Sequence, residues 1–205
     1  MKETSALICI PDITGFTEFM SEVSLESSKR IIPSLLNRII YANSINLKIS
    51  EIEGDAVLFY RNGPLPSAQE LIAQCRRFFH EFRAELDQIV ERNDNHHEYR
   101  DLTRKLGLKV IMHYGPIGMV QVGSHLKLMG EEIIVAHRLL KNSVSEKEYV
   151  LFSQDVVEQL KGSESSLITD WAVRQDDHYD HIGTMMYHYI NVDQLFQIEN
   201  SYVAG

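Results

Sequence analysis

The sequence has few of the features that direct a chain to a membrane or to an oxidising compartment. No apolar run approaches the ~20 residues that a membrane-spanning helix needs. The first residues, MKETSALICIPD, hold one lysine and an apolar stretch of about six residues, too short for a signal peptide. Only two cysteines occur, Cys9 and Cys75, both in apolar surroundings, so we expect buried thiols without a disulfide. We therefore expect a cytoplasmic protein with no membrane partner.

Basic residues are also in short supply. Against 29 acidic residues there are 20 lysines and arginines, which gives a net charge of −9. A field of this sign repels nucleic acid, so we expect no nucleic-acid partner. With 44% hydrophobic and 24% charged residues the chain is not of the disordered class. Its 205 residues suit one domain, or one domain with an elaborated tail.

Hydrophobic periodicity predicts a mixture of strands and helices. The clearest helix has one apolar stripe, and Ser67 with Glu70 forms a capping box at its start. Pro33 is expected to kink or begin an earlier helix, and Gly115-Pro116 to form a hairpin turn. Both strand–helix alternation and hairpins are present, which indicates an α+β sheet with helices packed on one face. The expected strands are 6–11, 46–60 with a turn at 53–55, 106–115, 117–123, 149–152, 168–174 and 183–190, and the expected helices are 27–45, 67–92, 130–141 and 153–161, with a polar connector at 93–104.

Three short motifs carry candidate chemistry. In Asp12-Ile13-Thr14-Gly15-Phe16-Thr17 a carboxylate ends a buried strand, and the chain turns at a glycine into a helix whose free N–H groups suit phosphate oxygens. The segment from Glu51 to Asp55 places a second carboxylate at a strand turn, and the helix from Gly130 carries Arg138. Two carboxylates and an arginine are what two-metal phosphoryl chemistry needs. Taken singly, each motif is equally compatible with a turn former, a helix cap or a solvated arginine.

Together, the motifs resemble the class III nucleotidyl cyclases, and more closely an uncharacterised family of cyclase-like proteins. The resemblance rests on IPDITGFTEF, SEIEGDAVLFY with Gly54-Asp55, Gly115-Pro116, and VAHRLLKN, in this order, and covers roughly residues 5–155. It implies an α+β ferredoxin-like sandwich of the cyclase type. Residues 1–160 would form the cyclase-like domain, and residues 161–205 a C-terminal strand extension packed on that domain.

The resemblance also implies a role for each matching residue. It implies two Mg²⁺ or Mn²⁺ ions as cofactors, a nucleoside triphosphate as ligand, and a homodimer in which Arg138 and the two aspartates of one site come from different subunits. Arg138 would stabilise the transition state. The implied metal ligands are Asp12, Asp55 and the carbonyl of Ile13, the implied phosphate-binding amides are those of Gly15, Phe16 and Thr17, and the implied base-reading positions are Glu51 and Lys127.

Two positions depart from the cyclase pattern. The family has an asparagine that orients the ribose four residues before its arginine, and this chain has Ile134 there. Residues four apart share a helix face, so Ile134 would lie beside Arg138 and offer no hydrogen bond to a sugar. Lys127 matches neither the adenine-reading nor the guanine-reading residue. Two functions therefore stay open: a nucleotidyl cyclase, and a degenerate cyclase-fold dimer that binds a nucleotide or a metal without turnover.

Several histidines lie outside these motifs. His96 and His97 fall in the polar connector, where a solvated loop is the simpler interpretation. The segment Asp176–His181 offers zinc ligands, but it has no flanking helix or cysteine partner, so a charged hairpin turn is the better interpretation. His113 alternates with apolar neighbours in a strand, a pattern typical of a buried histidine with satisfied hydrogen bonds.

Overall fold

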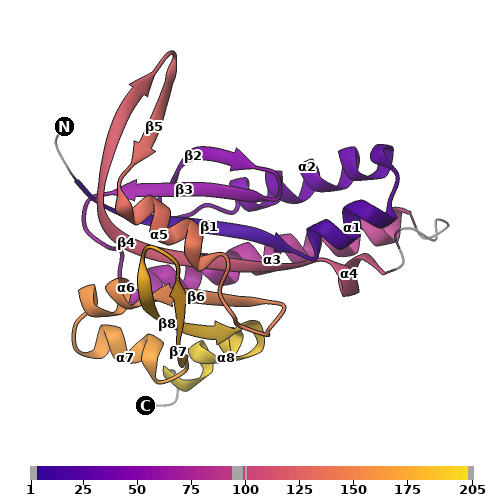
Figure 1. Ribbon diagram of the computed structural model, residues 1–205. Coiled ribbons are helices and arrows are strands. Elements are labelled where there is room, and N and C mark those ends of the chain that lie inside the picture. Colours follow the sequence, from indigo (N-terminus) through magenta and orange to yellow (C-terminus); the bar gives the residue numbers. More distant parts are fainter. Residues whose placement is uncertain (1–3, 94–98, 100, 203–205) are drawn as a thin grey trace.

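A computed structural model describes residues 4–93, 99 and 101–202 of the chain, and its central feature is a mixed β-sheet (Figure 1). The strand order is β2-β3-β1-β4-β6-β8-β7, and β5 pairs with β4 beside this path. Strands β4 and β6 are parallel, and the other pairs are antiparallel. The strands are β1 Thr4–Thr14, β2 Lys48–Glu53, β3 Ala56–Asn62, β4 Gly107–Val122, β5 His125–Met129, β6 Tyr149–Ser153, β7 Val173–Tyr179 and β8 Gly183–Asn191.

One face of the sheet buries the larger hydrophobic core against two long helices, α2 (Leu25–Tyr41) and α3 (Ala68–Arg92). The predicted capping box of α3 is confirmed: the Glu70 N–H donates to Ser67 Oγ at 3.3 Å, and the Ser67 N–H donates to Glu70 Oε2 at 2.9 Å. Helix α2 begins after Ser24 and continues through Pro33, so the proline neither starts nor ends it. The shorter helices are α1 Phe16–Glu22, α4 Leu102–Lys105, α5 Glu131–Leu139, α6 Gln154–Gln159, α7 Ser163–Thr169 and α8 Val192–Tyr202.

The opposite face of the sheet is covered in part by α5, which packs Val135, Ala136 and Leu139 over a second, smaller core. Helices therefore lie on both faces, and the expectation of helices on one face only is wrong. Side chains alternate between the faces along each strand. In β1, Leu7 belongs to the larger core and Ile8 to the smaller one. Helix α5 covers this second face only in part, and the candidate site lies on the part that it leaves open.

The predicted hairpin turn at Gly115-Pro116 is wrong. Strand β4 runs without interruption from Gly107 to Val122, and its hairpin partner is β5. Proline lacks the N–H that a central strand needs. At Pro116, however, β4 has a partner on one side only, because β6 pairs with residues 109–112 and β5 begins to pair at Gly118. The N–H that Pro116 lacks therefore faces no strand. Beyond it, residues 118–129 form a hairpin, the β4–β5 arm, which projects beyond the sheet (Figure 1).

The C-terminal part differs from its predicted elements. Residues predicted as a strand at 168–174 belong largely to α7 and the turn after it, and the edge strand β7 begins at Val173. Strand β8 pairs with β6, so this part of the chain extends the same sheet. The segment 94–98, with His96 and His97, lies outside the described residues. No helix in the described part of the chain combines the length and apolar character needed to cross a membrane.

The cysteines behave as expected. Cys9 and Cys75 are free thiols in the larger core, and burial raises the pKa of both. Thiolates are the reactive form of cysteine, so these two side chains act as small hydrophobic groups.

Gly15 provides a test of the junction between β1 and α1. It has φ +78°, and a Cβ added there would collide with the main-chain carbonyl oxygen of Lys105. We expect Gly15→Ala to lower the free energy of unfolding by about 3 kcal/mol, because the left-handed backbone and the collision both cost energy. Gly123 is the control, since it has φ +59° and open space around it. Gly123→Ala should cost only about 1 kcal/mol, and equal losses in urea unfolding would contradict the predicted collision.

Candidate functional site

The two candidate metal-binding aspartates meet where β1 ends and β3 begins, on the face of the sheet that carries α5. Asp12 on β1 lies opposite Ala56 on β3. Asp55 precedes Ala56 in the turn between β2 and β3, and its carbonyl accepts the Ile13 N–H at 3.1 Å. Gly54 in that turn has φ +60°, a conformation that glycine adopts readily. The expectation that Asp12 and Asp55 come together is thus met by the strand pairing.

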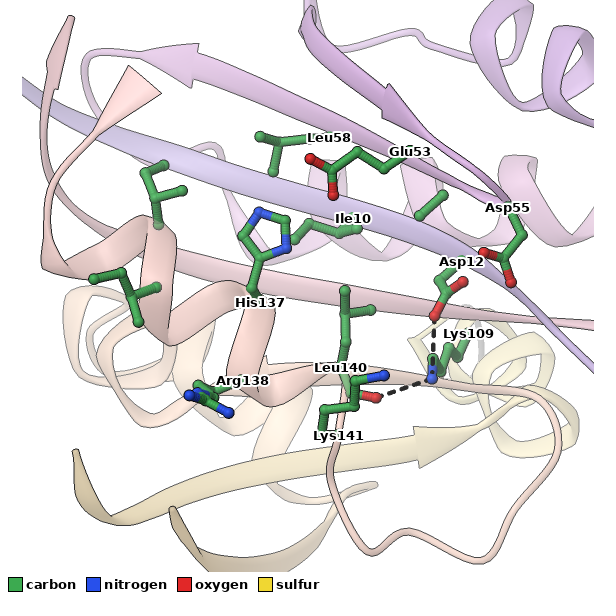
Figure 2. A pocket seen from close by; sticks show the side chains of 13 residues that line it. Ile10, Asp12, Glu53, Asp55, Leu58, Lys109, His137, Arg138, Leu140 and Lys141 are labelled. Carbon is green, nitrogen blue, oxygen red and sulfur yellow. Dashed lines mark hydrogen bonds and ion pairs between the residues drawn. The ribbon is translucent and has the colours of Figure 1, made fainter. Parts of the chain in front are cut away.

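A cavity of about 570 Å³ opens beside these carboxylates, between the sheet and α5 (Figure 2). Its walls combine apolar side chains from β1, β3 and α5 with charged groups at the rim. The residues lining it are Ile10, Asp12, Glu53, Asp55, Ala56, Leu58, Lys109, Ile133, Ile134, His137, Arg138, Leu140 and Lys141. An apolar cleft with a few converging charges is the usual form of a small-molecule site.

The electrostatics of the two carboxyl groups are coupled. Desolvation of the half-buried Asp55, followed by the charge of Asp12, raises the pKa of Asp55 to about 6. The negative charge of Asp12 thus acts directly on Asp55. Two neighbouring carboxylates of this kind attract a cation.

A lysine that the motifs did not single out supplies one such cation. Lys109 on β4 is the direct cross-strand partner of Asp12, and its Nζ lies 3.1 Å from Asp12 Oδ2. The same ammonium donates to the main-chain carbonyl of Leu140 at 3.0 Å. Figure 2 shows both interactions of Lys109 as dashed lines. The sequence signal was a lone charge in the otherwise apolar strand segment LKVIM.

Helix α5 is tied to β4 near both of its ends. At its start, Glu132 Oε2 lies 2.6 Å from Nε2 of the fully buried His113. The other ring nitrogen of His113 contacts Ser153 Oγ at 2.8 Å, which confirms the expected buried histidine with satisfied hydrogen bonds. Just past its end, Leu140 accepts the hydrogen bond from Lys109. These ties set the position of α5 over the cavity.

Arg138 and Ile134 both line this cavity from α5. Arg138 is exposed, lies at the far end of the cavity from Asp55 in Figure 2, and forms no ion pair among the described residues. Ile134 is 56% exposed, a large fraction for an apolar side chain. His137, which the motifs did not assign, points into the same space (Figure 2). The helix therefore presents a free cation beside an apolar position, as the four-residue spacing predicts.

The predicted phosphate-binding residues do not line this cavity. Gly15 precedes α1 and lines another cavity, of about 410 Å³, with Glu18, Arg104, Lys105 and Lys147 among its walls. Phe16 packs against the larger core. Thr17 is exposed in the first turn of α1. Ile13 is buried beneath the Asp55 turn.

The two predicted base-reading residues do meet, although in a separate cavity of about 590 Å³ between β2 and the β4–β5 arm. Lys127 Nζ lies 3.9 Å from Glu51 Oε1. Ser50 lines the same cavity, and its buried hydroxyl has no hydrogen-bond partner in the described part of the chain. An unsatisfied buried hydroxyl beside an exposed ion pair is suited to a polar ligand edge.

The zinc interpretation of Asp176–His181 receives no support. Asp177 instead accepts hydrogen bonds from the Ser143 N–H at 2.8 Å and from the Tyr187 hydroxyl at 2.6 Å. These hydrogen bonds give Asp177 a structural role. The residues beside it are spread along β7 and do not gather around one point. Among residues 4–93, 99 and 101–202, no group of three or more histidine, cysteine or acidic side chains is arranged to hold a metal ion.

Carboxylate oxygens suit Mg²⁺ and Mn²⁺, so Asp12 and Asp55 fit a divalent ion chemically. The ammonium of Lys109 already stands at one oxygen of Asp12, which leaves this donor set better matched to one ion than to two.

Comparison with known proteins gives the family. Residues 32–149 match the family described as "Protein of unknown function (DUF2652)". The chain belongs to the DUF2652 family. An uncharacterised protein of Mycobacterium tuberculosis (Rv2561/Rv2562) is 30% identical over 150 residues, which are 71% of this chain and 66% of that protein. The matched family region contains Asp55, Lys109 and Arg138, while Asp12 precedes it.

Solved structures similar to this DUF2652 chain include nucleotidyl cyclase domains. The adenylyl cyclase CyaB from P. aeruginosa has a TM-score of 0.66 and 17% identity over 93% of this chain and 95% of that one. The guanylyl cyclase Cya2 has a TM-score of 0.71 and 11% identity over 92% of each chain. The guanylate cyclase domain of RhGC from Catenaria anguillulae, in complex with GTP, has a TM-score of 0.60 and 18% identity, covering 93% and 98%. At such identities the likeness shows the fold, so the predicted cyclase-type α+β fold is confirmed.

The raised pKa of Asp55 predicts a pH-dependent stability. An aspartate in the unfolded chain titrates near 3.8, so the folded DUF2652 protein binds this proton more tightly and loses stability as the pH rises through about 6. With metal ions removed by EDTA, we expect Asp55→Asn to be more stable than wild type by about 1 kcal/mol at about pH 7.5, allowing for solvent screening. The difference should vanish below about pH 4.

Thermal unfolding across this pH range measures the effect. Glu53→Gln, in the same turn but with an exposed side chain, is the matched control and should change stability little at any of these pH values. A variant Asp55→Asn that is less stable than wild type at neutral pH would contradict the predicted cost of ionising Asp55.

Proposed function

We propose that this protein is a cyclase-fold homodimer that binds a nucleoside triphosphate with a divalent metal ion. The reaction to which its groups are suited is conversion of that nucleotide to a 3′,5′-cyclic nucleotide and pyrophosphate. The observation that carries the proposal is the convergence of Asp12 and Asp55 at the rim of a cavity that α5 borders with Arg138.

Each group has a definite part in this chemistry. Asp12, Asp55 and the carbonyl of Ile13 would hold Mg²⁺ or Mn²⁺, of which the cyclase resemblance implies two ions. A bound divalent ion would neutralise phosphate charge and polarise the phosphorus centre. In the reaction, the 3′-hydroxyl oxygen bonds to the α-phosphorus, its proton leaves, and the bond to pyrophosphate breaks. Arg138, which the cyclase resemblance assigns to the other subunit of the dimer, would stabilise the negative charge that develops on the phosphoryl oxygens.

A second copy of the chain would complete the site. Large apolar side chains are exposed on the arm and around the open face, where a partner would cover them; they include Ile52, Val122, Leu126, Met129 and Ile134. Exposed apolar patches of this kind mark interaction surfaces. In such a dimer the Glu51–Lys127 cavity of one subunit would face the Asp12–Asp55 cavity of the other, so that base and phosphates are held by different chains.

The second candidate is binding without turnover, and Ile134 favours it. A half-exposed isoleucine beside Arg138 offers the ribose no hydrogen bond, and the loss of one positioning contact costs a factor of about 10² in rate. The two predicted base-reading groups, Glu51 and Lys127, also face each other as an ion pair at 3.9 Å, and this attraction competes with a base. These features fit a module that senses a nucleotide or a metal.

Binding and turnover are tested together. Purified protein is incubated with Mn²⁺ and each of the four nucleoside triphosphates, with calorimetry for binding and chromatography for cyclic product and pyrophosphate. We expect binding of at least one nucleotide, weakened at least about tenfold in Asp12→Asn and in Asp55→Asn. Asp87→Asn, on the exposed side of α3, is the control and should bind as wild type. Absence of binding to all four nucleotides would refute the proposal, and binding without product would establish the second candidate.

Ile134→Asn separates the two candidates from another direction. If Ile134 limits turnover, an asparagine at this exposed position should raise the rate of cyclic product formation by about 10²-fold while the nucleotide Kd changes less. Ile134→Gln, which extends further and is polar, is the control for polarity alone. A rate unchanged by Ile134→Asn would show that the ribose contact is not what limits catalysis.

A further inference from the structure

We infer that Lys109 is a built-in cation at the proposed metal site, so that a divalent ion binds Asp12 only by displacing the Lys109 ammonium. The inference depends on the proposed function in one respect, since it takes Asp12 as a metal ligand. It adds a regulatory step to that function, because entry of the metal then requires the breaking of an internal ion pair.

The geometry of Lys109 supports this competition. Its Nζ stands 3.1 Å from Asp12 Oδ2, one of the two oxygens that Asp12 offers to a metal ion. The Lys109 and Asp12 side chains are only 18% and 15% exposed, so water screens the pair much less than it screens a surface pair. A cation in contact with one carboxylate oxygen repels a second cation at the same oxygen.

The backbone holds the two partners in place. Asp12 and Lys109 are directly opposed in the antiparallel register of β1 and β4, and opposed side chains on one face of such a pair are neighbours. A shift of one residue would move Lys109 to the other face, into the larger core. Lys109 is therefore confined beside Asp12 and can leave Oδ2 only by a change of its own side-chain rotamers.

Asp55 provides the point of entry. It forms no ion pair among the described residues, whereas Asp12, which lines the same cavity, is paired with Lys109. A metal ion can therefore meet the free carboxylate of Asp55 first and then compete with Lys109 for Asp12. This order follows from the asymmetry of the two acids, one paired and one unpaired.

Displacement would also reach α5. Lys109 connects Asp12 to the Leu140 carbonyl, directly after the helix that carries Arg138. When a metal ion takes Asp12, the link between β1 and the end of α5 is lost, while the tie between Glu132 and His113 at the helix start remains. The proposed metal site and the position of Arg138 are thereby coupled through one side chain.

The test uses Mn²⁺ alone, without nucleotide. The loss of the electron paramagnetic resonance signal of free Mn²⁺ gives the Kd of wild type, Lys109→Gln and Lys109→Met. Glutamine removes the charge and keeps an N–H donor for Leu140, whereas methionine removes both, so the first variant guards against loss of the fold. We expect both variants to bind Mn²⁺ at least about tenfold more tightly than wild type.

Two controls identify the cause. Lys141→Gln removes an exposed lysine that lines the same cavity, and its Kd should stay within about twofold of wild type if contact with Asp12 is what matters. Adding Asp12→Asn to Lys109→Gln should abolish the gain. Equal Mn²⁺ affinity of wild type and both Lys109 variants, with binding still lost in Asp12→Asn, would overturn the inference and leave the proposed metal role intact. No Mn²⁺ binding in any of these proteins would overturn both.

Discussion

The cross-strand ion pair between Asp12 and Lys109 is the interaction on which the site depends. It joins the two central strands of the sheet, β1 and β4, at the point where their shared face becomes open to the cavity. Because the strand register sets this contact, the position of every neighbouring group follows from it. Asp55 is held beside Asp12 by the next strand pair, and the end of α5 is held by the second hydrogen bond of Lys109.

The two faces of the sheet differ in how fully helices cover them. One buries the larger core beneath α2 and α3, which gives the strands a rigid support. The other carries only the smaller core beneath α5 and leaves its rim accessible. Placing charged groups on this less covered face avoids the cost of burying them fully. The same openness leaves Ile134 and part of the β4–β5 arm exposed, which fits a surface that a second chain would cover.

The cyclase-type fold was predicted from a resemblance to the class III cyclases, carried by the motif Asp12–Thr17, Gly54-Asp55 and the segment with Arg138 in this order. Such motifs are local and can be found in the sequence alone. The continuation of β4 through Pro116 was not predictable in this way. It depends on which strands flank β4 at that residue, and those strands come from distant parts of the chain. Helix α7 was missed because its few apolar residues also fit a short strand.

Strong local signals were enough to find the capped helix that begins after Ser67, the buried strand before Asp12 and the motif with Arg138. The pairing of Lys109 with Asp12, and the meeting of Glu51 and Lys127 in a separate cavity, follow from the folded arrangement alone. A charge acts on whatever lies within a few ångströms of it. Strand pairing, which joins residues about a hundred positions apart, decides what that neighbour is.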